Sequence, residues 1–343
     1  MQKFNKTTIY FVGPISNDVI DIVSTREANI LISQMDNKGK RRIKPIENLI
    51  AYKKANPTHK IKIIIDSGAF SVYKSGGKVN TDEYINFING IIGDIDYYVQ
   101  NDKIPGTINK KPSQYLCKQA EKWTWNDFLY MESKSKDPYK LLPVYHYRDN
   151  IRLLEKILTH RRPDGTLIDY ICIAPLKEKG KHRLNCPWLK RVHKKILELN
   201  PNVKVHALGF MQLKLIIENT WLTSADATSC DLSAGYGSLM TPYGQVKTSA
   251  KALENKDPKK SREHILNKPK KLPFVKEYVD DFQFLKVKGH PFYDSEFAKC
   301  NIPTWEEVLL KDSRGRTILN CLYLKLFEQN HPLIQKHIKL ASW

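Results

Sequence analysis

Three aspartates stand at or near the ends of runs of β-forming residues, where carboxylates can act as nucleophiles or as acids and bases. Asp66 follows the run IKIII, Asp102 follows IDYYVQ, and Asp226 lies within SADATS. The carboxyl ends of parallel strands open on one face of a barrel, so we expect these three side chains to converge. Two carboxylates around one pocket suit chemistry at an anomeric carbon, where one attacks the carbon and the other handles the proton of the leaving group.

The turn after Asp66 is built from small residues, which suits a binding site. Ser67, Gly68 and Ala69 leave space and backbone N–H groups for a flat ligand, and Phe70 could stack on that ligand. Each aspartate taken alone also suits a helix cap or a turn residue in a loop. Three of them at matching strand ends favour a shared site over three separate turns.

The elements that must position these side chains are short β-rich runs alternating with segments of helical periodicity. Eight such units within about 250 residues predict a (β/α)8 TIM barrel, and an open doubly wound sheet fits the same periodicity. His146 and Gly209 occupy positions near strand ends comparable to those of the aspartates. The eight expected strands are 8–13, 29–34, 61–65, 95–100, 141–147, 169–174, 204–210 and 224–229.

Three helices between these strands have clear signals. One begins at Thr81 as the expected N-cap, with two acidic residues in its first turn. Two more are expected over 149–160 and 186–200, the second with Pro187 early and basic residues late.

The character of the chain changes near residue 250, where Lys and Pro become frequent. We expect residues 1–250 to form the catalytic barrel and residues 251–343 to form a basic, mainly helical C-terminal extension packed on it. A long apolar face over 304–330 predicts helix in that extension. Arg314, Arg316 and Asn320 stand near the start of this helix, where packing is favoured over contact with phosphates.

A formal net charge of +20, from 56 Lys and Arg against 36 acidic residues, favours a polyanionic partner. The basic residues cluster in 37–45, 177–195 and 255–271, so a nucleic acid is the expected ligand. A general enrichment in Lys from an AT-rich genome is the alternative explanation.

The cysteines and the apolar segments exclude several other classes of protein. The six cysteines are scattered without close pairs, which argues against a disulfide framework or a C-x-x-C metal site. No apolar run approaches the roughly 20 residues that span a bilayer, and no signal peptide is visible, so we expect a cytoplasmic protein that does not bind membranes. No redox cofactor or nucleoside triphosphate is implied.

A family resemblance rests on an ordered set of motifs. DSGAFS (66–71) resembles the D-S-G-G-[FY]-Q signature of the tRNA-guanine transglycosylase superfamily, and SADATS (224–229) resembles the strand that carries its nucleophilic aspartate. NDKIPG (101–106) and the S-x-D-[SA]-T-S pattern are more similar to the phage-type branch, the 7-deazaguanine DNA transglycosylases. The motifs run in order over 61–229 and cover most of the expected barrel.

The resemblance implies a role for each matched position. Asp226 would attack C1′ and release guanine, and Asp66 would contact the base as general acid and base. Asp102 would accept hydrogen bonds from the guanine edge, and His146 stands where the tRNA enzymes have a glutamine that contacts the base. Ser67, Gly68, Phe70 and Gly209 would complete the base pocket, with Phe70 stacked on the ring and Gly209 allowing close approach of the backbone.

The implied substrates are a nucleic acid, with DNA preferred and tRNA as the alternative, and a free 7-deazaguanine base such as 7-cyano-7-deazaguanine. A non-catalytic nucleic-acid-binding barrel on the same scaffold is a third possibility. If the gene is viral, the host cytoplasm is the expected compartment. The resemblance leaves the oligomeric state open.

Two departures from the family pattern limit the resemblance. Ala174, Pro175 and Leu176 stand where a Gly-Gly-Leu is expected, and a proline has no N–H to offer a base. The C-x-C-x-x-C zinc motif of the tRNA enzymes is absent, so no metal site is expected. The residues that could still assemble one are Cys230, Cys300 and Cys321 with His264 or His290.

Overall fold

The computed structural model describes residues 7–13, 27–36, 39–74, 77–106, 112–175, 185–210, 213–227, 233–242, 244–248, 271–309 and 312–340. The chain forms two compact units. The first consists of Met1–Phe11, Ile15–Ala28 and Ala227–Trp343, and the second of Val12–Pro14 and Asn29–Asp226. The predicted boundary at residue 250 lies outside the described residues.

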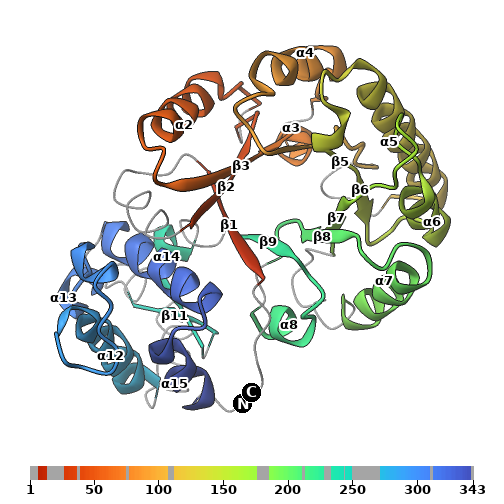
Figure 1. Cartoon of the computed structure of the whole chain (residues 1–343). Coiled ribbons are helices and arrows are strands. Elements are labelled where there is room, and N and C mark those ends of the chain that lie inside the picture. The colour runs from red at the N-terminus through yellow and green to blue at the C-terminus, as the bar shows by residue number, and fades with distance from the viewer. Residues whose placement is uncertain are drawn as a thin grey trace. The chain divides into compact units, whose positions relative to one another are not determined.

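A parallel sheet of nine strands curls into a nearly closed barrel, which confirms the predicted α/β TIM-like fold (Figure 1). The strand order is β5-β4-β3-β2-β1-β9-β8-β7-β6. The strands are β1 (Thr8–Val12), β2 (Glu27–Ser33), β3 (Lys60–Asp66), β4 (Tyr97–Val99), β5 (Leu141–Leu142), β6 (Val144–His146), β7 (Tyr170–Ala174), β8 (Lys204–Ala207) and β9 (Ser224–Ala227).

The ninth strand arises because the predicted fifth strand, 141–147, is divided at Pro143. Leu141 and Leu142 pair with β4, whereas Val144 to His146 pair with β7. Proline has no N–H to donate to a ladder, so the pairing changes partner at that residue. The two halves are the two ends of the sheet order, so one short stretch of chain holds both edges of the nearly closed barrel together.

Strand β3 shows how the barrel is filled from both faces. Ile61, Ile63, Ile64 and Ile65 are all buried, as expected for a strand covered by helices outside and by side chains inside. The buried Tyr84 hydroxyl donates to the carbonyl oxygens at the ends of β3 and β4, at 3.2 Å from Ile65 and 2.8 Å from Val99. These bonds hold the end of β3, where Asp66 lies, beside the end of β4, which Asp102 follows.

Helices of the second unit surround the strands, as Figure 1 shows. Helix α4 begins at Thr81, as predicted, but the expected N-cap is wrong, because the side chain of Asn80 accepts from the N–H groups of Asp82 and Glu83 and is the cap. Thr81 instead bonds Asp127 and Asn101. The helices are α2 (Ile43–Ala55), α3 (Ala69–Lys74), α4 (Thr81–Ile91), α5 (Gln114–Lys134), α6 (Ile151–Thr159), α7 (Asn185–Leu199) and α8 (Leu213–Glu218).

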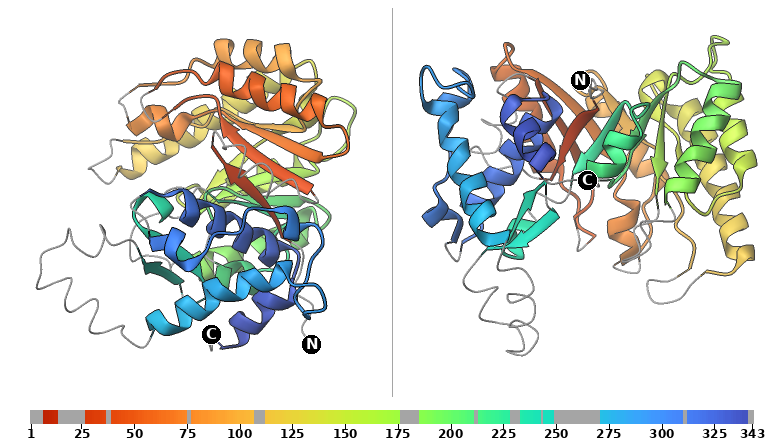
Figure 2. Two further views of the ribbon diagram at one scale, coloured as in Figure 1. Left: turned by 90° about the vertical axis from the view of Figure 1, so that its left-hand side faces the viewer. Right: turned by 90° about the horizontal axis from the view of Figure 1, so that it is seen from below.

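The described C-terminal residues are mainly helical, as predicted, and belong to the first unit. The predicted helix over 304–330 is two helices, α13 (Trp305–Leu309) and α14 (Arg314–Glu328). They lie with α12 (Lys271–Asp281), α15 (Pro332–Leu340) and a hairpin of β10 (Ser238–Thr241) and β11 (Gly244–Lys247) (Figure 2).

Buried polar side chains of α14 hold this unit together. The Arg316 guanidinium donates to the carbonyl oxygens of Ala234, Val308 and Asp312, and Asn320 accepts from Met240 N–H at 2.7 Å. Both side chains are buried, so the packing interpretation is confirmed for these two residues, whereas Arg314 is exposed.

No helix among the described residues combines the length and the apolar character needed to cross a bilayer.

Candidate active site at the carboxyl ends of the strands

Asp66 is the last residue of β3, and its surroundings favour the protonated carboxyl group. Burial is the largest cause, and the negative charges of Asp102 and Asp226 add to it, which together raise the pKa of Asp66 to about 6. The hydrogen bond from Gly68 N–H, at 3.1 Å, and the nearby Ser33 side chain oppose the shift. Asp66 therefore has the properties of a group that can donate and accept a proton near neutral pH.

Asp102 lies three residues beyond β4 and is paired with His146 at the end of β6. His146 Nε2 is 2.7 Å from Asp102 Oδ2, and His146 Nδ1 is 3.1 Å from Asp149 Oδ2. The same Asp149 oxygen accepts from the His146 backbone N–H at 2.7 Å. The imidazole is thus fixed between two carboxylates.

The two carboxylates decide the charge of this histidine. Burial alone would lower the pKa of His146 and is the largest single effect, but Asp149 and Asp102 together outweigh it and raise the pKa to about 10. His146 is therefore an imidazolium at neutral pH, with both N–H groups donated to carboxylates.

Asp226 is the third residue of β9 and is almost completely buried, with 4% of its surface exposed. Its Oδ1 accepts a short hydrogen bond from Gly209 N–H, in the turn that follows β8. Gly209 has a positive φ of 60°, a conformation that glycine adopts without strain. The Gly209 backbone therefore supplies a hydrogen-bond donor to the Asp226 carboxylate.

The negative charges of the aspartates raise the pKa values of the same neighbouring groups, which supports the predicted convergence. Asp102 and Asp226 both raise the pKa of Asp66. The buried thiol of Cys172 on β7 has its pKa raised well above the usual value, by burial first and then by the charges of Asp226, Asp66 and Asp102. Asp66 on β3, Asp102 in the loop after β4 and Asp226 on β9 therefore lie close enough for their charges to influence the same region of the second unit.

Gly68 is required for a different reason from the expected one. Its φ is +79°, and a Cβ there would lie 2.6 Å from Met35 Cβ and 2.9 Å from Ser33 Oγ, so any side chain would collide with the end of β2. The N–H groups of Gly68 and Ala69 are also already donated, to Asp66 and to Ser67 Oγ.

Phe70 and Ser67 differ sharply in accessibility. Phe70 is 45% exposed on α3, in keeping with a ring that can stack on a ligand, whereas Ser67 is fully buried. We therefore place Phe70, and not Ser67, among the residues able to touch a base.

Several residues of this region were missed from the sequence. Asp149, which anchors His146, lies three residues after it in YHYRD, and that spacing was the available signal. His206 and Ser224 lie within the strands that carry Gly209 and Asp226. Neither residue has a sequence signal of its own, because a polar residue in a strand shows no partner until the strands are paired.

The described cysteines are packed at least in part. Cys172, Cys300 and Cys321 are buried, and Cys117 and Cys186 are partly buried. Within the described part of the chain, no group of three or more His, Cys, Asp or Glu side chains is placed to hold a metal ion. Two candidate ligands, Cys230 and His264, lie outside it, as do Thr228, Ser229 and Leu176 of the quoted motifs.

No protein-family model matches this chain, and no curated protein matches it significantly.

Proposed function

We propose that this chain is a base-exchanging transglycosylase that replaces guanine in DNA with a 7-deazaguanine derivative. The observation that carries the proposal is the environment of Asp66, a strand-end carboxyl group with a pKa of about 6 that is influenced by Asp102 and Asp226. The motif resemblance supplies the reaction class, and Asp66 supplies a carboxyl group whose pKa suits an acid and a base.

The first half of the reaction needs a nucleophile and an acid. Asp226 uses a carboxylate lone pair to attack C1′ of the nucleotide, the C1′–N9 bond breaks, and its electron pair leaves with guanine. Asp66, in its protonated form, donates a proton to the departing base. The products are free guanine and a glycosyl ester of Asp226.

The second half reverses these roles. The incoming 7-deazaguanine base transfers its N9 proton to the Asp66 carboxylate, and N9 attacks C1′ as the ester bond to Asp226 breaks. Two displacements on the same carbon give retention of configuration. A carboxyl group with a pKa of about 6 suits both directions of proton transfer near neutral pH.

Asp102 is proposed to read the guanine edge by accepting from the ring N–H and the exocyclic amine. His146 already donates to Asp102 Oδ2, so this oxygen is oriented before the base arrives. One carboxylate has enough lone pairs to accept from both the imidazolium and the base.

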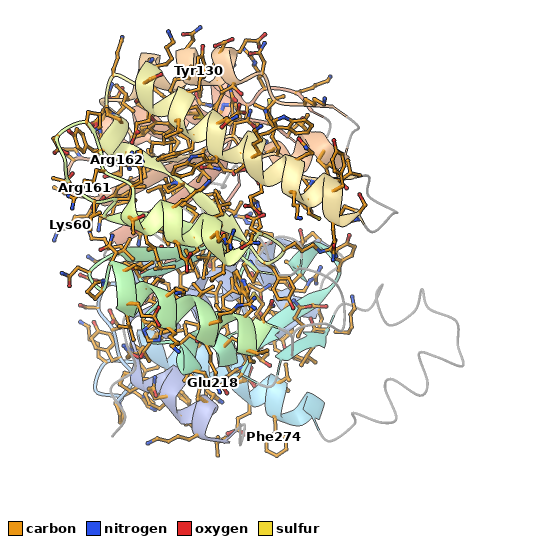
Figure 3. The ribbon with its side chains drawn as sticks, turned by 90° about the vertical axis from the view of Figure 1, so that its right-hand side faces the viewer. Lys60, Tyr130, Arg161, Arg162, Glu218 and Phe274 are labelled. Atoms are coloured by element: carbon orange, nitrogen blue, oxygen red, sulfur yellow. The ribbon has the colours of Figure 1, made fainter. Side chains whose placement is uncertain are left out.

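Features of the surface support a nucleic-acid partner. The net charge is +20, although of the three predicted basic segments 255–271 lies almost entirely, and 177–195 in part, outside the described residues. Helix α5 adds exposed aromatic rings and lysines on one side, and none of its exposed side chains is acidic. Figure 3 shows this helix, with Tyr130 labelled. The exposed rings and cations are Tyr115, Trp123, Tyr130, Lys118, Lys122 and Lys134.

Stacking rings beside cations suit single-stranded nucleic acid, whose bases are accessible. In a duplex, C1′ of the target is close to the base stack, so the enzyme would flip the nucleotide out or act on unpaired strands. Helix α5 follows the loop that carries Asp102 and begins on the carboxyl-end side of the strands, as helices in β/α units do.

The proposal is tested by incubating the protein with a labelled 7-deazaguanine base and either DNA or tRNA. We expect label in DNA, single-stranded or locally opened, with release of one guanine for each base incorporated. Incorporation into tRNA alone would replace the DNA proposal with the tRNA alternative. Absence of incorporation into either would favour a non-catalytic nucleic-acid-binding barrel.

The nucleophile is tested with Asp226→Ala and Asp226→Asn, with Asp164→Asn in an exposed loop as the matched control. Both changes at Asp226 should abolish exchange and the covalent adduct, while Asp164→Asn should retain both. Exchange at the parent rate in Asp226→Ala would mean that another group attacks C1′.

A further inference from the structure

A buried chain of polar side chains leads to Asp226 from inside the barrel. The Tyr170 hydroxyl lies 2.6 Å from the Ser224 hydroxyl, which lies 2.5 Å from His206 Nδ1. The other ring nitrogen, His206 Nε2, lies 3.5 Å from Asp226 Oδ1. The chain joins β7, β8 and β9 and ends on the carboxylate proposed as the nucleophile.

Strand register holds this chain together. His206 pairs with Ser224 in the parallel ladder between β8 and β9, and Cys172 pairs with His206 between β7 and β8. Residues two apart on a strand face the same side, so Tyr170 lies on the face of Cys172, and Ser224 on the face of Asp226. The polar side chains therefore share a face of three adjacent strands.

All of these groups are buried, so their hydrogen bonds matter. Tyr170 and Asp226 are each 4% exposed, Ser224 is 1% exposed and His206 is fully buried. A buried polar side chain is costly unless it is paired, and an apolar side chain would fill the same space without that cost. The hydrogen bonds among the Tyr170 hydroxyl, the Ser224 hydroxyl and His206 Nδ1 satisfy these atoms, and His206 Nε2 is left facing Asp226 Oδ1 at 3.5 Å, which points to a task beyond packing.

The hydrogen-bond partners determine which of Tyr170, Ser224 and His206 donates in each contact. Burial raises the pKa of the Tyr170 phenol well above its usual value, so Tyr170 keeps its proton and donates to Ser224. The Ser224 hydroxyl is then free to donate to His206 Nδ1. This assignment leaves the proton of a neutral imidazole on Nε2, which faces Asp226.

The contacts of Asp226 distinguish its two oxygens. Gly209 N–H donates to Oδ1, and His206 Nε2 approaches the same oxygen. The geometry points to His206, held by Ser224 and Tyr170, as a positioning residue that fixes Asp226 through Oδ1 so that Oδ2 attacks C1′. This assignment rests on the proposed transglycosylation.

The same contacts serve both displacements. When Oδ2 bonds C1′ and guanine leaves with the C1′–N9 electron pair, Oδ1 becomes the carbonyl oxygen of the ester, which still accepts from Gly209 N–H and still faces His206 Nε2. When the incoming base displaces the ester, the electron pair of the O–C1′ bond returns to the carboxylate. Gly209 and His206 then stabilise its regained negative charge.

The test compares variants that interrupt this chain at different points. His206→Leu removes the donor to Asp226, whereas His206→Gln keeps an N–H that can reach it, so Gln should restore part of the rate. We expect His206→Leu to lower kcat for exchange about 10- to 100-fold, with KM for the base nearly unchanged, because the loss is in alignment. Tyr170→Phe removes a single hydroxyl from the far end and should cause a smaller fall.

Tyr98→Phe is the matched control. The Tyr98 hydroxyl also donates to a serine hydroxyl at 2.6 Å, but this serine is Ser135, which does not belong to the row of polar side chains that leads to Asp226. Equal losses of kcat in Tyr98→Phe and Tyr170→Phe, or a parent-like rate in His206→Leu, would overturn the positioning role. Nitrogen NMR of labelled His206 gives a readout that does not depend on activity. We expect the Nε2–H tautomer in the parent protein and a mixture of tautomers in Ser224→Ala.

Failures of the two proposals are distinguishable. A parent protein that exchanges bases but shows the Nδ1–H tautomer at His206 keeps the proposed function and overturns the positioning role. A parent protein that shows the Nε2–H tautomer but forms neither adduct nor product overturns the transglycosylase proposal, and with it the role of His206 toward a nucleophile.

Discussion

His146 Nε2 lies 2.7 Å from Asp102 Oδ2, and the imidazole is held from its other side by Asp149. Asp102, the carboxylate proposed to contact the base, is therefore already paired with a cation before the base binds. A lone carboxylate facing a base would be held less firmly and would repel Asp66 and Asp226 without compensation. The imidazolium thus lets three carboxylates converge at lower electrostatic cost.

The first prediction concerns the stability that His146 provides. Its pKa is raised to about 10 from a usual 6.5, so its contribution should be fully present below pH 6.5 and be lost as the pH rises toward about 10. His146→Gln should lower the free energy of unfolding at pH 7 by roughly 3 kcal/mol, because two carboxylates lose their cation. Urea denaturation of the parent protein and of His146→Gln at pH 7 and at pH 10 checks this. An equal loss of unfolding free energy at the two pH values would contradict the assignment.

The second prediction separates the two half-reactions by their pH dependence. Guanine release uses protonated Asp66, so its rate should fall as the pH rises through about 6. Base incorporation from the isolated glycosyl-enzyme uses the Asp66 carboxylate, so its rate should fall as the pH drops below about 6. Single-turnover measurements of each half should show opposite limbs, and Asp66→Asn should remove both. Limbs of the same sign would exclude Asp66 from one of its two roles.

The third prediction is a conflict between stability and activity at Asp66. Its folded-state pKa of about 6 lies above the usual pKa of 3.8, so the parent protein loses stability as the pH rises from about 3.8 to about 6. Asp66→Asn should therefore stabilise the protein at pH 7 to 8 by about 1–3 kcal/mol while lowering exchange about 100-fold or more. The gain in unfolding free energy should shrink when both proteins are compared at pH 5. A variant less stable than the parent at pH 8 would argue that Asp66 is stabilised in its charged form.

The barrel and its strand ends were predictable because alternating β-rich and amphipathic segments set them locally. The eight expected strands occur in order, and parallel strands bring Asp66, Asp102 and Asp226 to one region. The division at Pro143 could also have been foreseen from the missing N–H. Helix α5 was missed because its solvent-facing side carries aromatic and aliphatic side chains, which weaken the contrast between an apolar and a polar face.

The finer chemistry of the site was less predictable, because it depends on partners from distant strands. A histidine between two aspartates becomes a permanent cation, and a glycine N–H occupies an aspartate oxygen, only once the loops are in place. Gly68 shows the same limitation: the reason for its missing side chain is Met35, which precedes it by 33 residues and meets it only in the folded chain.

The fourth prediction tests that reason. Gly68→Ala combines a φ of +79° with a Cβ only 2.6 Å from Met35 Cβ, so it should destabilise the protein by about 3 kcal/mol. Gly165→Ala is the matched control, since its φ is +84° and nothing lies within 4 Å of its Cβ, and it should cost about 1 kcal/mol. Adding Met35→Gly should recover part of the loss in Gly68→Ala. Equal thermal destabilisation of the two glycine variants would show that backbone strain alone explains both.

The last prediction concerns the exposed side of α5. If it holds single-stranded DNA, Trp123→Ala should weaken binding by about 1–3 kcal/mol through lost stacking. Lys118→Gln with Lys122→Gln should reduce the slope of log affinity against log salt by about 1.5, because two phosphate contacts are lost. Lys54→Gln with Lys276→Gln removes the same charge from exposed lysines that are paired with aspartates, and it should leave the slope nearly unchanged. Fluorescence anisotropy over a salt series measures both quantities, and equal slopes for the two double variants would show that α5 senses only the net charge of the protein.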